Sequence, residues 1–154
     1  MNSPETANAR TTTTNGDHSH QVPRAAAVVA LGGVALIHLL ELQTKLKEVP
    51  YIGVGYIFLV VSCVIAASML VHRNSRLGWM IAGGVALATL IGFSLTRTVG
   101  LPQSRNDIGN WLEPMGLAAL FVEACVVMLA GYGLGISRLT NANRTDQVSA
   151  RSAV

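Results

Sequence analysis

Four ionisable residues fall inside long apolar segments of the sequence, where a membrane would surround them. They are His38, Glu41, Arg97 and Glu123. A charged side chain at the centre of a membrane-spanning helix costs about 2.5–3.5 kcal/mol on insertion scales. Such a residue usually faces the interior of a helix bundle or a cavity, so these four are the candidates for an intramembrane polar site.

The spacing of the four residues places them at related depths. His38 and Glu41 are three residues apart, which puts them on one helix face. Arg97 ends a later apolar segment on the same side, and its side chain is long enough to pair with Glu41. Glu123 lies about ten residues into the last apolar segment, near the midplane at a rise of about 1.5 Å per residue. We therefore expect a polar seam from Glu123 past His38 to Glu41 and Arg97.

Three kinds of chemistry fit this seam. In the first, it is structural: Arg97 reaches the interface and pairs with Glu41, while His38 bonds Glu123 and fixes the helix register. In the second, His38 and Glu123 carry protons or bind a cationic ligand. In the third, His38, Glu41 and Glu123 bind a metal ion, since one histidine and two carboxylates are a plausible ligand set. The spacing alone leaves all three open.

Other familiar chemistries lack their residues. A bis-histidine haem needs two deep histidines, and only His38 is deep, because His72 sits at a segment end. The sequence has no Ser/His/Asp arrangement, HExxH motif, phosphate-binding glycine loop or CxxC motif. Cys63 and Cys125 lie in apolar segments without metal-ligand spacing, which indicates packing residues. Nothing in the sequence supports an enzyme, and no cofactor is expected.

The composition indicates the elements that must position the site. The chain has 154 residues, of which 51% are hydrophobic and only 12% charged, about half the charge of a typical soluble domain. Four segments are long enough to cross a bilayer, which requires roughly 20 apolar residues. They cover about 25–44, 51–71, 77–98 and 114–136. The partners that follow are the lipid bilayer and no nucleic acid, because no basic cluster with interleaved aromatic residues is present.

The spans are expected to be helices, since backbone groups in hydrocarbon must be bonded within their own segment. A β-barrel would need alternating apolar and polar residues, and the sequence lacks that pattern. Because the connections are short, neighbouring helices run antiparallel. The sequence predicts an all-α, up-down four-helix bundle over residues 23–137, with disordered polar tails at 1–22 and 138–154.

Basic residues predict the orientation of this bundle. One side carries seven of them: Arg10, Arg24, Arg73, Arg76, Arg138, Arg144 and Arg151. The other carries four: Lys45, Lys47, Arg97 and Arg105. Both termini are therefore expected to be cytoplasmic in a plasma membrane, which places the 99–113 loop outside.

The outer loop carries residues that order a chain. Gly100 can end a helix in a left-handed cap, and Pro102 prevents the helix from continuing. Trp111 suits the headgroup level, and Pro114 suits the first turn of the last helix. The loop is either packed over the bundle mouth or an ordinary interfacial turn.

Small residues recur at helix-packing spacing in two spans. They are Gly84, Ala88 and Gly92 in the third span, and Gly131 and Gly135 in the fourth. Such residues let helix backbones approach closely. They favour packing within one bundle, and self-association into a homo-oligomer or a larger membrane complex is the alternative.

The sequence resembles small four-span membrane proteins that are common in actinobacteria. Three stretches carry the resemblance: VPYIGVGYIFL from Val49, TRTVGLP from Thr96 and DIGNWLEPMGLAALFVE from Asp107. The resemblance covers about residues 37–130. It implies a membrane location and a four-helix fold, and it carries over no catalytic residue, because that family has no assigned reaction.

The sequence therefore favours a binding or accessory membrane protein with an intramembrane site for a proton or ion. The alternative is a small proton-coupled multidrug-type exporter that acts as a homodimer. Such exporters also have four helices and one membrane carboxylate, but that carboxylate lies in the first helix, whereas the midplane acid here is Glu123.

Reporter fusions at residues 47, 75, 105 and 150 test the predicted topology. Fusions at 75 and 150 should report the cytoplasm, and those at 47 and 105 the opposite side, because basic residues favour the cytoplasmic face. A cytoplasmic signal from the fusion at 105 would overturn the orientation.

Overall fold

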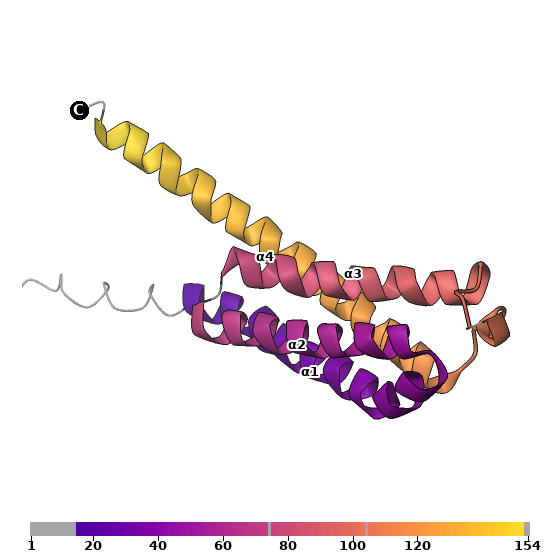
Figure 1. The fold of residues 1–154 in the computed structure, drawn as a ribbon. Helices are drawn as coiled ribbons and strands as arrows, with labels where there is room; N and C mark the ends of the chain where they lie inside the picture. Colours follow the sequence, from indigo (N-terminus) through magenta and orange to yellow (C-terminus); the bar gives the residue numbers. More distant parts are fainter. Residues whose placement is uncertain (1–14, 74, 104, 153–154) are drawn as a thin grey trace, which may run out of the picture.

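The computed structural model describes residues 15–73, 75–103 and 105–152 and consists of four long helices (Figure 1). Their bounds are α1 Asn15–Glu48, α2 Pro50–Arg73, α3 Arg76–Thr98 and α4 Pro114–Ser152. A short 3-10 helix, η1 (Arg105–Asp107), lies in the loop between α3 and α4. The described residues contain no strand, which confirms the predicted all-α fold class.

All four helices contain a segment long and apolar enough to cross a membrane. These segments are Gln21–Glu48, Pro50–His72, Arg76–Thr98 and Pro114–Gly135. They match the four predicted spans, and the first is extended by several residues at each end. The chain is a multi-pass membrane protein.

The ends of α1 and α4 differ from the predicted disorder. Residues 15–22 and 138–152 are helical in the structure, whereas both segments were expected to be unstructured tails. Adding a residue to an existing helix gains a hydrogen bond without the cost of nucleation, so a span can extend into a polar flank. The tail residues 1–14, 153 and 154 lie outside the described residues.

Each helix packs against the next along the chain, and α4 returns to pack against α1 (Figure 1). This ring of antiparallel neighbours is the predicted up-down topology. Val49 alone separates α1 from α2, and Pro50 begins α2, where a missing N–H costs nothing. Ser75 caps α3 by accepting a hydrogen bond from the Gly78 N–H at 3.1 Å. We call the end with Val49 and the 99–113 loop the loop end.

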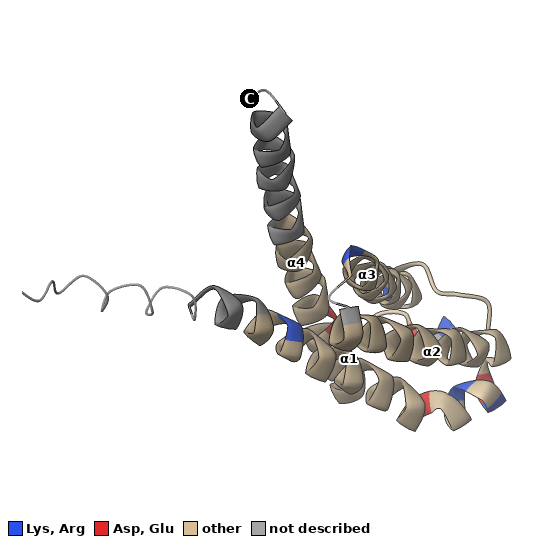
Figure 2. Cartoon of the chain, turned by 90° about the vertical axis from the view of Figure 1, so that its left-hand side faces the viewer, with Lys and Arg blue, Asp and Glu red and all other residues tan. Residues whose placement is uncertain are grey.

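The packed core fills the half of the bundle away from the loop end. Small and aliphatic residues of all four helices form its larger cluster: Leu31, Val34, Leu59, Cys63, Ala66, Ala82, Ala86 and Val126. A second cluster near the α2–α3 connection contains Ala27, Leu70, Trp79 and Ala130. Large apolar side chains such as Phe58 and Phe121 are 71% exposed, as expected for residues that face lipid. Charged residues lie mostly near the helix ends (Figure 2).

The glycines that pack the bundle are not the predicted ones. A Cβ added at Gly84, Gly92, Gly131 or Gly135 would meet nothing within 4 Å, so these residues do not bring helices of this chain together. At Gly133, in contrast, an added Cβ would lie 2.5 Å from the Trp79 indole. The helix spacing therefore depends on where large neighbours lie, which residue spacing along one helix cannot reveal.

Gly133→Ala should lower the free energy of unfolding by about 1–3 kcal/mol, because the new methyl overlaps a buried, rigid indole. Gly131→Ala, on the same helix with open space around it, should leave it unchanged or raise it by up to about 1 kcal/mol, because alanine favours the helix over glycine. Thermal unfolding in detergent measures both. Equal stability of the two variants would contradict this account of α3–α4 packing.

Candidate functional site

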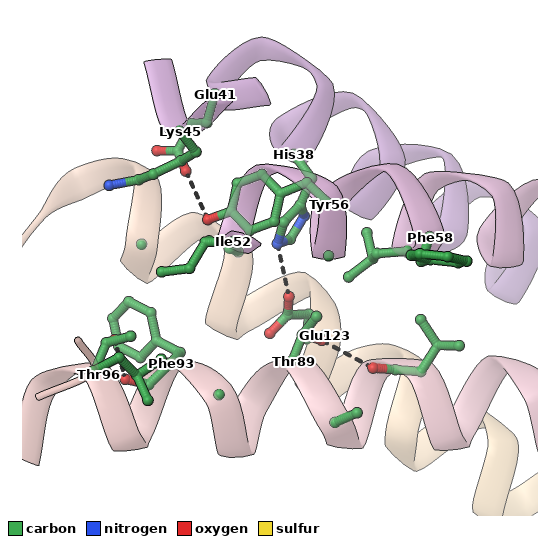
Figure 3. Close-up of a pocket in the computed structure, with 18 of the residues that line it drawn as sticks. His38, Glu41, Lys45, Ile52, Tyr56, Phe58, Thr89, Phe93, Thr96 and Glu123 are labelled. Carbon is green, nitrogen blue, oxygen red and sulfur yellow. Dashed lines mark hydrogen bonds and ion pairs between the residues drawn. The ribbon is translucent and has the colours of Figure 1, made fainter. Parts of the chain in front are cut away.

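A cavity of about 410 Å³ lies between the helices toward the loop end (Figure 3). All four helices contribute to its lining, as does the 99–113 loop. The four predicted site residues, His38, Glu41, Arg97 and Glu123, all line this one cavity. The structure thus brings together residues from three helices that the sequence predicted to form a seam.

His38 and Glu123 face each other inside the bundle (Figure 3). The Nε2 atom of His38 lies 3.5 Å from Oε1 of Glu123, and their side chains are only 7% and 2% exposed. This separation is long for a hydrogen bond, so His38 does not hold the carboxyl tightly. Thr89 on α3 lies near the Glu123 carboxyl, but its hydroxyl donates to the Val85 and Ala86 carbonyls of its own helix.

The other ring nitrogen of His38, Nδ1, is hydrogen-bonded to the backbone. Nδ1 lies 2.9 Å from the carbonyl oxygen of Val34, one helical turn earlier. A carbonyl only accepts, so Nδ1 carries a proton and donates it. In the neutral ring, Nε2 then carries a lone pair that points toward the carboxyl of Glu123. Two facing acceptors repel, so a further proton, on Glu123 or on Nε2, would stabilise the pair.

One turn toward the loop end, Glu41 and Tyr56 continue the polar lining. The Tyr56 hydroxyl donates to Oε2 of Glu41 at 3.4 Å. The Tyr56 ring also meets the His38 ring edge-to-face, with centroids 4.6 Å apart. Sequence reasoning missed Tyr56, although a phenol six residues inside an apolar span is a signal, because a buried hydroxyl needs a partner.

Arg97 pairs differently from the prediction. The sequence favoured Glu41 as its partner, but its guanidinium contacts Asp107 and Glu113 instead, with Nη1 3.0 Å from Oδ1 of Asp107. The guanidinium carbon of Arg97, Cζ, also lies 4.7 Å from the centroid of the Phe93 ring. Arg97 is 6% exposed, and two acids that approach from the loop satisfy it better than one acid already bonded to Tyr56. The residue therefore clamps the loop to the bundle.

The described residues of the loop, 99–103 and 105–113, pack over the loop end. Gly100 has φ 75°, the left-handed cap that the sequence predicted, and its N–H donates to the Leu95 carbonyl at 3.0 Å. The carbonyl of Pro102 accepts a 2.6 Å hydrogen bond from the Tyr51 hydroxyl. The Trp111 ring lies edge-to-face with Phe93, at 6.2 Å between centroids. Pro114 begins α4, as predicted.

The geometry does not support the hypothesis that His38, Glu41 and Glu123 bind a metal ion. Within the part of the chain that the structure describes, no three His, Cys, Asp or Glu side chains converge as a metal site requires. His38 and Glu123 face each other, while Glu41 turns to Tyr56.

Comparison with known proteins finds no matching family model, no similar curated protein and no similar solved structure. The resemblance to small actinobacterial membrane proteins therefore stays a prediction, and the site must be interpreted from its own geometry.

Replacing Arg97 by Met should lower the free energy of unfolding by about 1.5–3 kcal/mol, because it removes charged hydrogen bonds. Amide hydrogen exchange should accelerate across the 99–113 loop. Arg105→Met is the matched control, since Arg105 is exposed on the same loop, and should leave both unchanged. Equal effects of the two substitutions would show that Arg97 is no clamp.

Proposed function

We propose that the protein is a binding or accessory component of the plasma membrane with an intramembrane site that exchanges a proton for a cation. The pair His38 and Glu123 would hold that proton. The main support for the proposal is the hydrogen bond from Nδ1 of His38 to the Val34 carbonyl, because this bond leaves Nε2 facing the buried carboxyl of Glu123.

The physical argument concerns the state without the proton. A carboxylate that faces the Nε2 lone pair in a low-dielectric interior is unfavourable, because neither atom can donate to the other. A cation placed between them would satisfy both. The empty space required for such an exchange is available, since both residues line the same cavity.

Orientation and family membership complete the proposal. With both termini cytoplasmic, the loop end and the clamp at Arg97 would face outward, and the cavity would be reached from that side. Membership of the actinobacterial four-span family is consistent with a small accessory protein. The purely structural alternative, in which His38 and Glu123 only fix the register of α1 against α4, makes a different prediction.

Infrared difference spectra recorded across a pH titration test the proton site. The bands of the His38 ring and the Glu123 carboxyl should change together, because interacting groups titrate as a unit. Glu123→Gln, which preserves the shape of the side chain, should abolish both changes. His38→Gln should remove the ring band and shift the pH at which the Glu123 carboxyl titrates, because the carboxyl loses its partner. Ring-labelled histidine, with Gln at positions 18, 20 and 72, assigns the imidazole band.

A thermal-stability double-mutant cycle with the same substitutions serves as the control. An unchanged His38 band in the Glu123→Gln protein, or no titration of either band, would overturn the proton site. Strong coupling in stability without titration would instead indicate a structural pair.

The homodimeric exporter remains the second candidate, because an acid at the bottom of a cavity is also what proton-coupled export requires. The His38–Glu123 pair is complete within one chain, however, so a dimer is not needed to form it. Proton-driven efflux of cationic dyes from vesicles, lost in Glu123→Gln, would favour the exporter over an accessory protein.

A further inference from the structure

The charges around the cavity do not balance. Four carboxyl groups line it, those of Glu41, Asp107, Glu113 and Glu123, against two permanent cations, Lys45 and Arg97. Arg97 serves Asp107 and Glu113 together, and Lys45 also lies 3.8 Å from Glu48. Once the shared proton leaves, the lining carries an excess of negative charge. Electrostatic complementarity then favours a cation and disfavours an anion.

The walls of the cavity suit an apolar ligand. Apolar atoms form most of the lining surface, and large apolar side chains contribute to it: Ile52, Tyr56, Phe58, Leu59 and Phe93. A small hydrated metal ion would lose its water here without three convergent ligands to replace it. An organic cation keeps its charge beside the carboxylate and places its apolar groups against these walls, and aromatic faces attract cations in addition.

Part of the cavity lining lies on the lipid-facing side of α2 and α3. Gly55 and Phe58 on α2 and Ala88 on α3 line the cavity and are also exposed. A Cβ added at Gly55 or Gly92 would meet nothing within 4 Å, so no neighbouring helix covers these two positions. Phe58 and Ala88 lie about 12 and 15 Å along their helices from the loop end, at a rise of about 1.5 Å per residue. This depth is within the hydrocarbon of a bilayer.

We propose that the cavity binds a lipophilic monovalent organic cation, which enters from the bilayer between α2 and α3 and replaces the proton shared by His38 and Glu123. This inference rests on the proposed function. One proton leaves the pair for each cation bound, and the Glu123 carboxylate and the Nε2 lone pair of His38 both face the cation. The groups around the pair are Glu41 on α1, Tyr56 and Cys63 on α2, and Thr89 on α3. Arg97 is turned away toward its two loop acids.

Titration calorimetry of the protein in lipid nanodiscs, with tetraphenylphosphonium as the probe, tests the ligand class. Binding should release about one proton per cation, read from the heats in two buffers of different ionisation enthalpy. Glu123→Gln should weaken binding roughly tenfold or more and abolish the release, because the charged contact is lost. Tetraphenylborate has the same shape and the opposite charge and should not bind beyond empty nanodiscs. Binding of both ions, or unchanged affinity in Glu123→Gln, would overturn the proposal.

A matched pair of glycine variants on α3 tests the route. Gly92→Leu should weaken tetraphenylphosphonium binding roughly tenfold or more, because the leucine occupies the opening. Gly84→Leu, equally open but outside the cavity lining, should bind like the unmodified protein. Should Gly92→Leu not fold, Ala88→Phe obstructs the same opening. Equal losses at residues 84 and 92 would overturn the route and point to a second copy on this face.

The infrared titration separates failure of this inference from failure of the proposed function. If the bands of His38 and Glu123 titrate together but no phosphonium binds, the proton site stands and the ligand class is wrong. If the bands do not titrate, both this inference and the proposed function are wrong.

Discussion

The structure depends on one constraint: a polar group inside a membrane bundle must find its partner within the protein. A soluble protein can leave a histidine or glutamate half-solvated, but hydrocarbon offers no substitute for water. His38 meets this constraint by donating from Nδ1 to the Val34 carbonyl. In the neutral ring, this hydrogen bond leaves Nε2 as an acceptor. The group that faces Nε2 is the buried carboxyl of Glu123, which is why we propose that the two share a proton.

The same constraint divides the bundle along its length. Away from the loop end, alanines, valines and leucines pack without polar atoms, and Trp79 fills the space left by Gly133. Toward the loop end the helices enclose a cavity rather than a core. The Arg97 clamp holds the loop over this end through Asp107 and Glu113, so an opened bundle keeps its shape without close helix packing.

Much of this could be predicted from the sequence, because long apolar segments and short connections leave few alternatives to an up-down bundle. The depth of His38 and Glu123 also follows from counting residues, and the structure places both on one cavity. The partner of Arg97 did not follow, since Glu41, Asp107 and Glu113 are all near it in depth and only the path of the loop selects among them. Tyr56 was missed because tyrosine is counted among the hydrophobic residues and its hydroxyl is ignored. The packing role predicted for the open glycines of α3 was wrong, because spacing shows a helix face without showing what covers it.

The proposed proton site depends on His38 keeping its proton on Nδ1 and presenting Nε2 to Glu123. Nitrogen-15 NMR of ring-labelled protein, with the other three histidines replaced, measures which nitrogen carries the proton. We expect a hydrogen-bonded Nδ1–H at every pH at which the protein is folded, with only the Nε2 signal changing on titration. A neutral ring with its proton on Nε2 and a bare Nδ1 would contradict the account, because Glu123 would then be an ordinary acceptor with no proton to exchange.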